Sequence, residues 1–169
     1  MDGYYAFMLV ATAFVLMMTV PALALFYGGM SRSKSVLNMM MMSFGAMGVV
    51  GVVYVLWGWS MSFGTFDAEQ DVANLFNNPF ELFGLVDIDP NSYVFVGFLL
   101  TFAVITAALI SGAVADRLKF SSWLLFVPLW LTLSYFPIAH MVWGGGFLGT
   151  AENGLAGLLF DGETLPIDY

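Results

Sequence analysis

The sequence predicts an all-α protein, a polytopic transmembrane helix bundle with four spans. A helix needs about 20 mostly apolar residues to cross a bilayer, and four stretches of that length occur, at residues 4–27, 36–63, 92–115 and 120–143. Hydrophobic residues make up 60% of the chain and charged residues only 9%, and the mean hydropathy is +0.88. This composition lies outside the range of ordinary soluble domains.

Two basic clusters determine the predicted topology. Arg32 and Lys34 separate the first two spans, Arg117 and Lys119 separate the last two, and the chain has no other Lys or Arg. Short loops with Lys and Arg stay on the cytoplasmic side. We therefore expect both chain ends outside, in a multi-pass protein of the cell (plasma) membrane with its N-terminus outside. Of the carboxylates, only Asp116 joins a basic cluster.

The spans carry signals of bending and packing. Pro21 predicts a kink near the inner end of the first span, because proline removes a backbone donor and crowds the preceding turn. Pro128 and Pro137 predict bends in the fourth span. On the third span, small residues recur every four positions and predict close packing against other helices. These residues are Ala103, Ala107, Ser111 and Ala115.

Two polar segments lie on the outer side in this topology. The outer connector, 64–91, is acidic, and its residues 72–83 predict a short amphipathic helix at the membrane surface. The outer tail, 144–169, is glycine-rich and acidic. Its apolar run at 155–160 is too short to cross a bilayer.

Several classes of chemistry are excluded by composition. The absence of cysteine excludes disulfides and thiolate sites, and the chain has one histidine. No charged residue lies within a predicted span, although ion pumps commonly place charged groups there. We expect no enzyme activity, no metal and no cofactor. The net charge of −8 resides mostly in the outer segments, and no basic patch predicts nucleic-acid binding.

Aromatic side chains are the remaining candidates for a binding site. Phe98 and Phe102 are four residues apart, so they lie on one helix face near the outer end of the third span. Trp143 closes the fourth span at the same surface. Such rings could hold a small cation at about 0.5–2 kcal/mol per contact. Packing and interfacial anchoring are the commoner uses of these residues, and His140 is read as a hydrogen-bonding residue rather than a proton carrier.

Three ordered motifs carry a family resemblance. They are PALALFYGGM at 21–30, followed by Arg32, Lys34 and VLN at 36–38; AVADRLKF at 113–120; and WLTLSYFPIAHMVWGGG at 130–146. With these motifs, the chain closely resembles the N-terminal portion of the ammonium transporter/methylammonium permease/Rhesus family. The resemblance implies a transporter of about eleven spans, of which this chain would be the first four.

The resemblance also implies roles for individual residues. Phe102 matches the phenylalanine that forms the outer part of a gate, and Phe98 matches a second aromatic at the same vestibule. Trp143 matches the tryptophan that offers cation–π contact to ammonium. Asp168 matches an aspartate near the pore entrance with a structural or recruitment role. His140 lies outside the family's pore histidine pair, and neither member of that pair has a counterpart in these 169 residues.

The implied function is transmembrane transport of ammonium or methylammonium. The cation would be recruited at the outer aromatic vestibule and passed through a hydrophobic pore that residues absent here complete. The resemblance further implies a homotrimer and a PII-type regulatory protein at the cytoplasmic face. Two other functions remain open at this point: an ammonium-sensing membrane module of a signalling protein, and an accessory membrane subunit that transports nothing.

Overall fold

The computed structural model describes residues 2–64, 71–72, 75–149 and 154–160. Within these residues, four helices are long and apolar enough to cross a membrane: Gly3–Met30, Val36–Ser62, Pro90–Val114 and Phe120–Trp143. The predicted all-α class with four membrane-span helices is confirmed. The chain divides into two compact units, which are described separately. Unit 1 comprises Met1–Tyr54 and Ile88–Leu131, and unit 2 comprises Val55–Asp87 and Thr132–Tyr169.

The first long helix in unit 1 breaks where proline predicts. Helix α1 (Asp2–Met17) leads through the π-helical segment η1 (Met18–Leu23) into α2 (Ala24–Met30). Val20, directly before Pro21, has an extended backbone with φ −133° and ψ 110°. Proline disfavours helical backbone in the residue that precedes it, so the predicted kink at Pro21 is confirmed.

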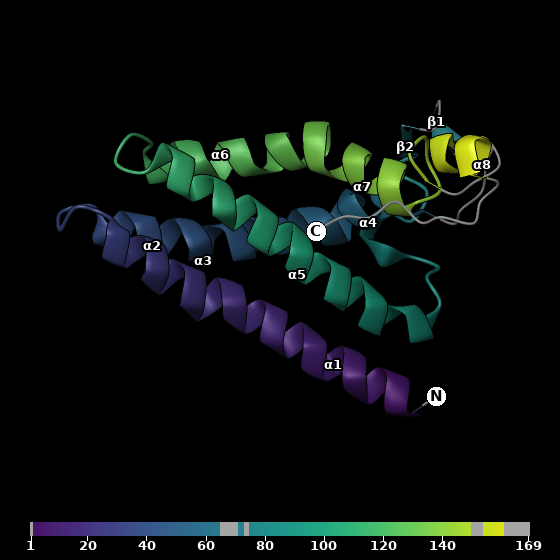
Figure 1. Ribbon diagram of the computed structural model, residues 1–169, viewed down its shortest axis with the longest axis horizontal. Helices are drawn as coiled ribbons and strands as arrows, with labels where there is room; N and C mark the ends of the chain where they lie inside the picture. Colours follow the sequence, from purple (N-terminus) through teal and green to yellow (C-terminus); the bar gives the residue numbers. More distant parts are fainter. Residues whose placement is uncertain (1, 65–70, 73–74, 150–153, 161–169) are drawn as a thin grey trace. The chain divides into compact units, whose positions relative to one another are not determined.

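The remaining helices of unit 1 pack around a core rich in alanine, valine and methionine, with Trp123 as its largest side chain. Helix α5 (Tyr93–Ile110) packs on α1 and on α3 (Val36–Val53), and α3 packs in turn on α2 and α6 (Phe120–Trp130). Figure 1 shows α1, in purple, running beside α5. Trp123 is fully buried, and its indole Nε1 donates to the Met42 carbonyl at 2.9 Å. A buried indole N–H needs such a partner, so this bond ties α6 to α3.

The small-residue stripe lies in this packing. Ala103, Ala107 and Ser111 are fully buried, and Ala115 is half-buried beyond the end of the helix. Helix α5 begins after the 3₁₀ turn η4 (Pro90–Ser92) and ends in another, η5 (Ser111–Val114). The stripe therefore serves close helix packing within unit 1, as its spacing predicts.

Unit 2 contains the C-terminal ends of the second and fourth long helices and several short elements. The second long helix passes through the π-helical segment η2 (Tyr54–Gly58) into α4 (Trp59–Ser62). The fourth passes through η6 (Leu131–Tyr135), also π-helical, into α7 (Phe136–Trp143). Pro137 is the second residue of α7 and directly follows this π-helical segment. Helix α7 packs on α4, and α8 (Leu155–Phe160) is the last described helix.

The predicted amphipathic helix at 72–83 is wrong. The segment instead contains strands β1 (Asp71–Val72) and β2 (Phe76–Asn77), which pair antiparallel, and the 3₁₀ turn η3 (Phe83–Leu85) follows them.

Local polar bonds explain why this segment is not helical. The Asn77 side chain accepts from the backbone N–H of Asn78, and the Asn78 side chain accepts from that of Phe80. Such bonds compete with helical ones, and Pro79 disfavours helical backbone at Asn78. The Ser60 hydroxyl donates to the Asn78 carbonyl at 2.7 Å and so holds the turn to α4.

Candidate functional site

The aromatic pair on α5 is formed by residues one helical turn apart. The rings of Phe98 and Phe102 meet edge to face, with centroids 4.9 Å apart and planes at 73°. Both residues are half-buried in unit 1. Edge-to-face contact directs the positive rim of one ring at the negative face of the other. The two rings therefore share one helix face, as their spacing predicts, and they hold each other in place.

Trp143 lies at the end of α7 in unit 2, with 40% of its surface exposed. An indole with this exposure retains surface that could meet a ligand. The next residue, Gly144, adjoins α4 so closely that a Cβ there would collide with the Ser62 carbonyl oxygen. The backbone that carries Trp143 is thus held by contact with another helix.

His140 supports this junction from inside unit 2. Its side chain is buried, and Nδ1 lies 3.1 Å from the Ser62 carbonyl oxygen. A carbonyl only accepts, so Nδ1 must carry the proton and donate it. This bond links α7 to α4 directly beneath Gly144. The interpretation of His140 as a hydrogen-bonding residue is confirmed.

The site residues predicted from the sequence fall in different parts of the chain. Phe98 and Phe102 are in contact within unit 1, and Trp143 belongs to unit 2. A common vestibule for all three remains a prediction. Asp168 lies outside the described residues. Within the described residues, no group of three His, Cys, Asp or Glu side chains could hold a metal ion.

Unit 2 also contains a cavity that sequence reasoning missed. Its volume is about 420 Å³, and it is lined by Trp57, Met61, Pro79, Phe80, Phe83 and Thr132. The Trp57 indole N–H donates to the Thr132 hydroxyl oxygen at 3.0 Å, so the indole donor has a partner within the lining. The lining residues come from three separate segments, so no local sequence motif predicts the cavity. Its apolar lining suits an uncharged group better than a cation.

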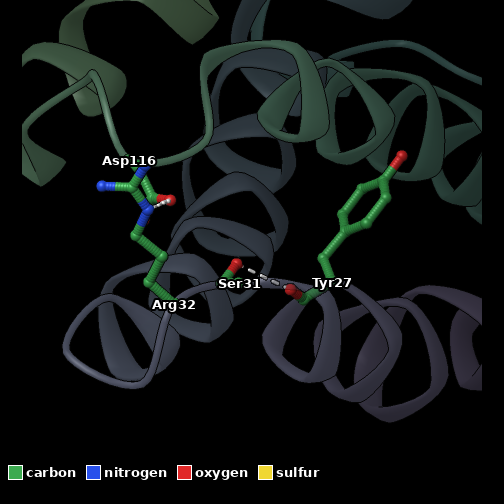
Figure 2. Close-up of polar contacts among 4 residues, drawn as sticks. All are labelled: Tyr27, Ser31, Arg32 and Asp116. Carbon is green, nitrogen blue, oxygen red and sulfur yellow. Dashed lines mark hydrogen bonds and ion pairs between the residues drawn. The ribbon is translucent and has the colours of Figure 1, made fainter.

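Polar contacts in unit 1 bring the two basic loops together, as Figure 2 shows. Arg32 Nε lies 3.7 Å from Asp116 Oδ2, across 84 positions of sequence. Beside this ion pair, the Ser31 hydroxyl donates to the Tyr27 carbonyl at 2.8 Å. The Tyr27 hydroxyl donates to the Leu109 carbonyl at 3.2 Å and so connects the end of α2 to the end of α5. The only sequence signal for the pair was a carboxylate inside a basic cluster.

Asn38 adds a second link between the same segments. Its side-chain amide donates to the Leu118 carbonyl at 3.3 Å, so the start of α3 is joined to the loop that precedes α6. The loop before α6 is therefore held to the first basic loop through Asp116 and to the start of α3 through Leu118.

Comparisons with known proteins agree on one family. A sequence profile described as the Ammonium Transporter Family matches residues 6–160. An ammonium transporter of Mycobacterium tuberculosis is 51% identical, over 90% of this chain and 35% of the relative. An ammonium transporter of Aquifex aeolicus is 46% identical, over 86% of this chain and 35% of the relative. The crystal structure of Saccharomyces cerevisiae Mep2 is similar at a TM-score of 0.73 and 28% identity, over 86% of this chain and 35% of that one. The chain thus spans about a third of the length of these relatives.

Proposed function

Because the chain belongs to the Ammonium Transporter Family, we propose that it takes part in ammonium transport by recruiting the cation at an outer vestibule of Phe98, Phe102 and Trp143. The observation that carries this proposal is the Phe98–Phe102 ring pair, which is in contact and only half-buried. The four helices of membrane-span length and the relatives named ammonium transporters also support the proposal.

The chemistry of such a vestibule follows from desolvation. A small cation loses water as it approaches an apolar pore, and a charge without compensation is very unfavourable there. Aromatic faces return part of that energy, at about 0.5–2 kcal/mol per contact. Ammonium and methylammonium also carry directional N–H donors, which potassium lacks. We therefore propose that the vestibule accepts both nitrogen cations and holds potassium less well.

The same proposal includes an orientation and an assembly. Both chain ends lie outside, the loops at 31–35 and 115–119 lie in the cytoplasm, and the protein resides in the plasma membrane. Clustering of every Lys and Arg in these two loops supports the orientation. The homotrimer, the PII-type partner and the role of Asp168 at the pore entrance rest on family membership alone.

Substitution of Trp143 by leucine tests the vestibule in the complete protein. The change removes a cation–π face but keeps an apolar side chain at a partly exposed position. We expect uptake of labelled methylammonium to need a concentration about 2- to 30-fold higher for half-maximal rate, since one contact of this kind is lost.

Phe80→Leu is the matched control, because Phe80 is an exposed aromatic of unit 2 outside the three proposed site residues. It should leave the concentration dependence unchanged. If Trp143→Leu behaves like this control at normal membrane abundance, Trp143 does not belong to the site.

Single cysteines test the orientation, because the chain has none of its own. Ser33, in the loop before α3, and Asn91, in the 3₁₀ turn η4, are both exposed and lie on opposite predicted sides. In intact cells, an impermeant maleimide should label Asn91→Cys and not Ser33→Cys, and permeabilised cells should give both signals. The reverse pattern in intact cells would overturn the topology.

A further inference from the structure

Trp143, the proposed vestibule residue at the end of α7, continues a helix face that is held against the second long helix. Phe136, His140 and Trp143 are separated by four and then three residues, so they lie along one face of the helix. Seven residues bring an α-helix back to within about 20° of its starting direction, so Trp143 follows Phe136 two turns later. The direction of the indole therefore depends on the contacts that hold this face.

The first turn of α7 rests on a glycine of η2. Phe136 is fully buried, and a Cβ at Gly58 would lie 2.5 Å from its Cζ atom and 2.8 Å from its Cε1 atom. Any side chain at position 58 would therefore overlap the ring and force the two segments apart. The contact between Phe136 and Gly58 thus fixes how closely α7 approaches η2.

A hydrogen bond beside this contact restricts the rotation of the same helix. The Trp57 indole N–H donates to the Thr132 hydroxyl at 3.0 Å, from η2 to η6. Trp57 directly precedes Gly58, and Thr132 is four residues before Phe136. An apolar contact between a ring and a glycine has no preferred direction, whereas a hydrogen bond weakens steeply when its angle changes. The bond therefore supplies a directional constraint that packing alone does not.

Hydrogen bonds at the other end of α7 attach Trp143 firmly to the helix. His140 is bonded to the Ser62 carbonyl. The backbone N–H of Gly144 donates to the His140 carbonyl at 2.9 Å, and that of Gly146 donates to the same carbonyl at 3.1 Å. The backbone around Trp143 is thus closed onto α7, and the residue turns only as far as the helix turns.

We propose that Trp57 and Thr132 are positioning residues for cation recruitment, because their hydrogen bond fixes the orientation of α7 and thereby directs the Trp143 indole. The inference rests on the proposed function, since it requires that Trp143 contacts the cation. Without the bond, α7 samples further orientations. The apparent affinity for the cation then falls in proportion to the fraction of molecules whose indole is correctly directed.

Replacing Thr132 by valine in the complete protein tests the inference, because valine keeps the branched shape and removes the hydroxyl. We expect the methylammonium concentration for half-maximal uptake to rise about 2- to 10-fold, as the loss of one ordinary hydrogen bond allows. The maximal rate per molecule should not change. Thr132→Ser keeps the hydroxyl and should restore the original value, and Trp57→Phe should reproduce the rise by removing the donor.

Thr12→Val is the matched control. Thr12 is half-buried like Thr132, but its hydroxyl donates to the Met8 carbonyl of its own helix at 2.7 Å. The same chemical change at this position should leave the concentration dependence of uptake as it was.

A double variant separates positioning from a general loosening of unit 2. If the bond acts through Trp143, Thr132→Val should cause no further rise in a protein that already carries Trp143→Leu. Multiplication of the two effects would show that the bond acts elsewhere. A lower maximal rate or thermal stability for Thr132→Val, with unchanged concentration dependence, would leave the bond a structural role only.

The single variants also distinguish this inference from the vestibule proposal. If Trp143→Leu raises the half-maximal concentration and neither Thr132→Val nor Trp57→Phe does, the positioning role is wrong and the vestibule stands. If Trp143→Leu itself has no effect, the vestibule proposal fails for Trp143, and the positioning role fails with it.

Discussion

Replacing Gly144 by alanine is expected to disrupt unit 2 and abolish transport by the complete protein. The new Cβ would collide with the Ser62 carbonyl oxygen and lie 2.6 Å from His140 Nδ1. The carbonyl belongs to the backbone of a helix end and cannot rotate away as a flexible side chain would. Helices α4 and α7 must separate, and the His140–Ser62 hydrogen bond is lost with their contact.

The expected magnitude is large for a one-carbon change. Overpacking costs about 1–3 kcal/mol, and a buried polar group that loses its partner costs about 1–3 kcal/mol more. Thermal stability in detergent and methylammonium uptake are the measurements.

Gly51→Ala is the matched control, because among the described residues no atom outside the local backbone of its own helix lies within 4 Å of the position that its Cβ would take. That variant should fold and transport normally. Equal stability of the two variants would contradict the close approach of Gly144 to α4.

A polypeptide of residues 1–169, expressed without any further chain, is expected not to restore ammonium uptake. Its described part supplies four helices of membrane-span length, whereas the relatives it matches are about three times as long. Its single histidine is buried against Ser62. We expect the spans to insert, because insertion depends on the hydrophobicity of each, but no complete pore to form.

Cells that lack their own ammonium transporters, grown with limiting ammonium at low pH, give the readout. The complete protein is the positive control, and membrane insertion of the short polypeptide must be verified by fractionation. Growth rescue by residues 1–169 alone would show that a pore can form without the remaining two thirds of the family's length.

Much of the fold was predictable because the thickness of a bilayer sets the length of a spanning helix, and apolar stretches of that length can be read directly from the sequence. Four apolar stretches gave four helices, and Pro21 gave its kink because proline acts on its own neighbour. The spacing of Phe98 and Phe102 likewise predicted their contact, since residues four apart meet on any α-helix. Each of these inferences depends only on residues close together in the chain.

The features that could not be predicted depend on distant residues or on local competition. The Arg32–Asp116 pair and the Trp57–Thr132 bond join residues 84 and 75 positions apart, and no local pattern encodes such a meeting. The helix predicted for residues 72–83 of the connector was wrong for a different reason. The apolar spacing of this segment fitted a helix, but the Asn77 and Asn78 side chains bond to nearby backbone N–H groups, and such bonds compete with helical ones.

The π-helical segment η6 changes the rotational phase of the fourth long helix. Along α6 and into the first residue of η6, the buried residues Trp123, Val127 and Leu131 follow one another at intervals of four, but the next fully buried residue, Phe136, comes after five. A residue inserted without breaking a helix turns everything beyond it by about 100°. Uninterrupted α-geometry would have favoured burial of Ile138, which is 51% exposed, in place of Ala139.

The length of the fourth long helix and the choice of which of its side chains face the interior can therefore change independently. Removing one residue from η6 would shorten the helix by only about 1.5 Å, which a bilayer tolerates readily. The same removal would rotate the whole of α7, so that Phe136 and His140 would leave the interior together. A single-residue deletion in η6 would therefore change which side chains of α7 face the interior, as if many residues had been substituted at once.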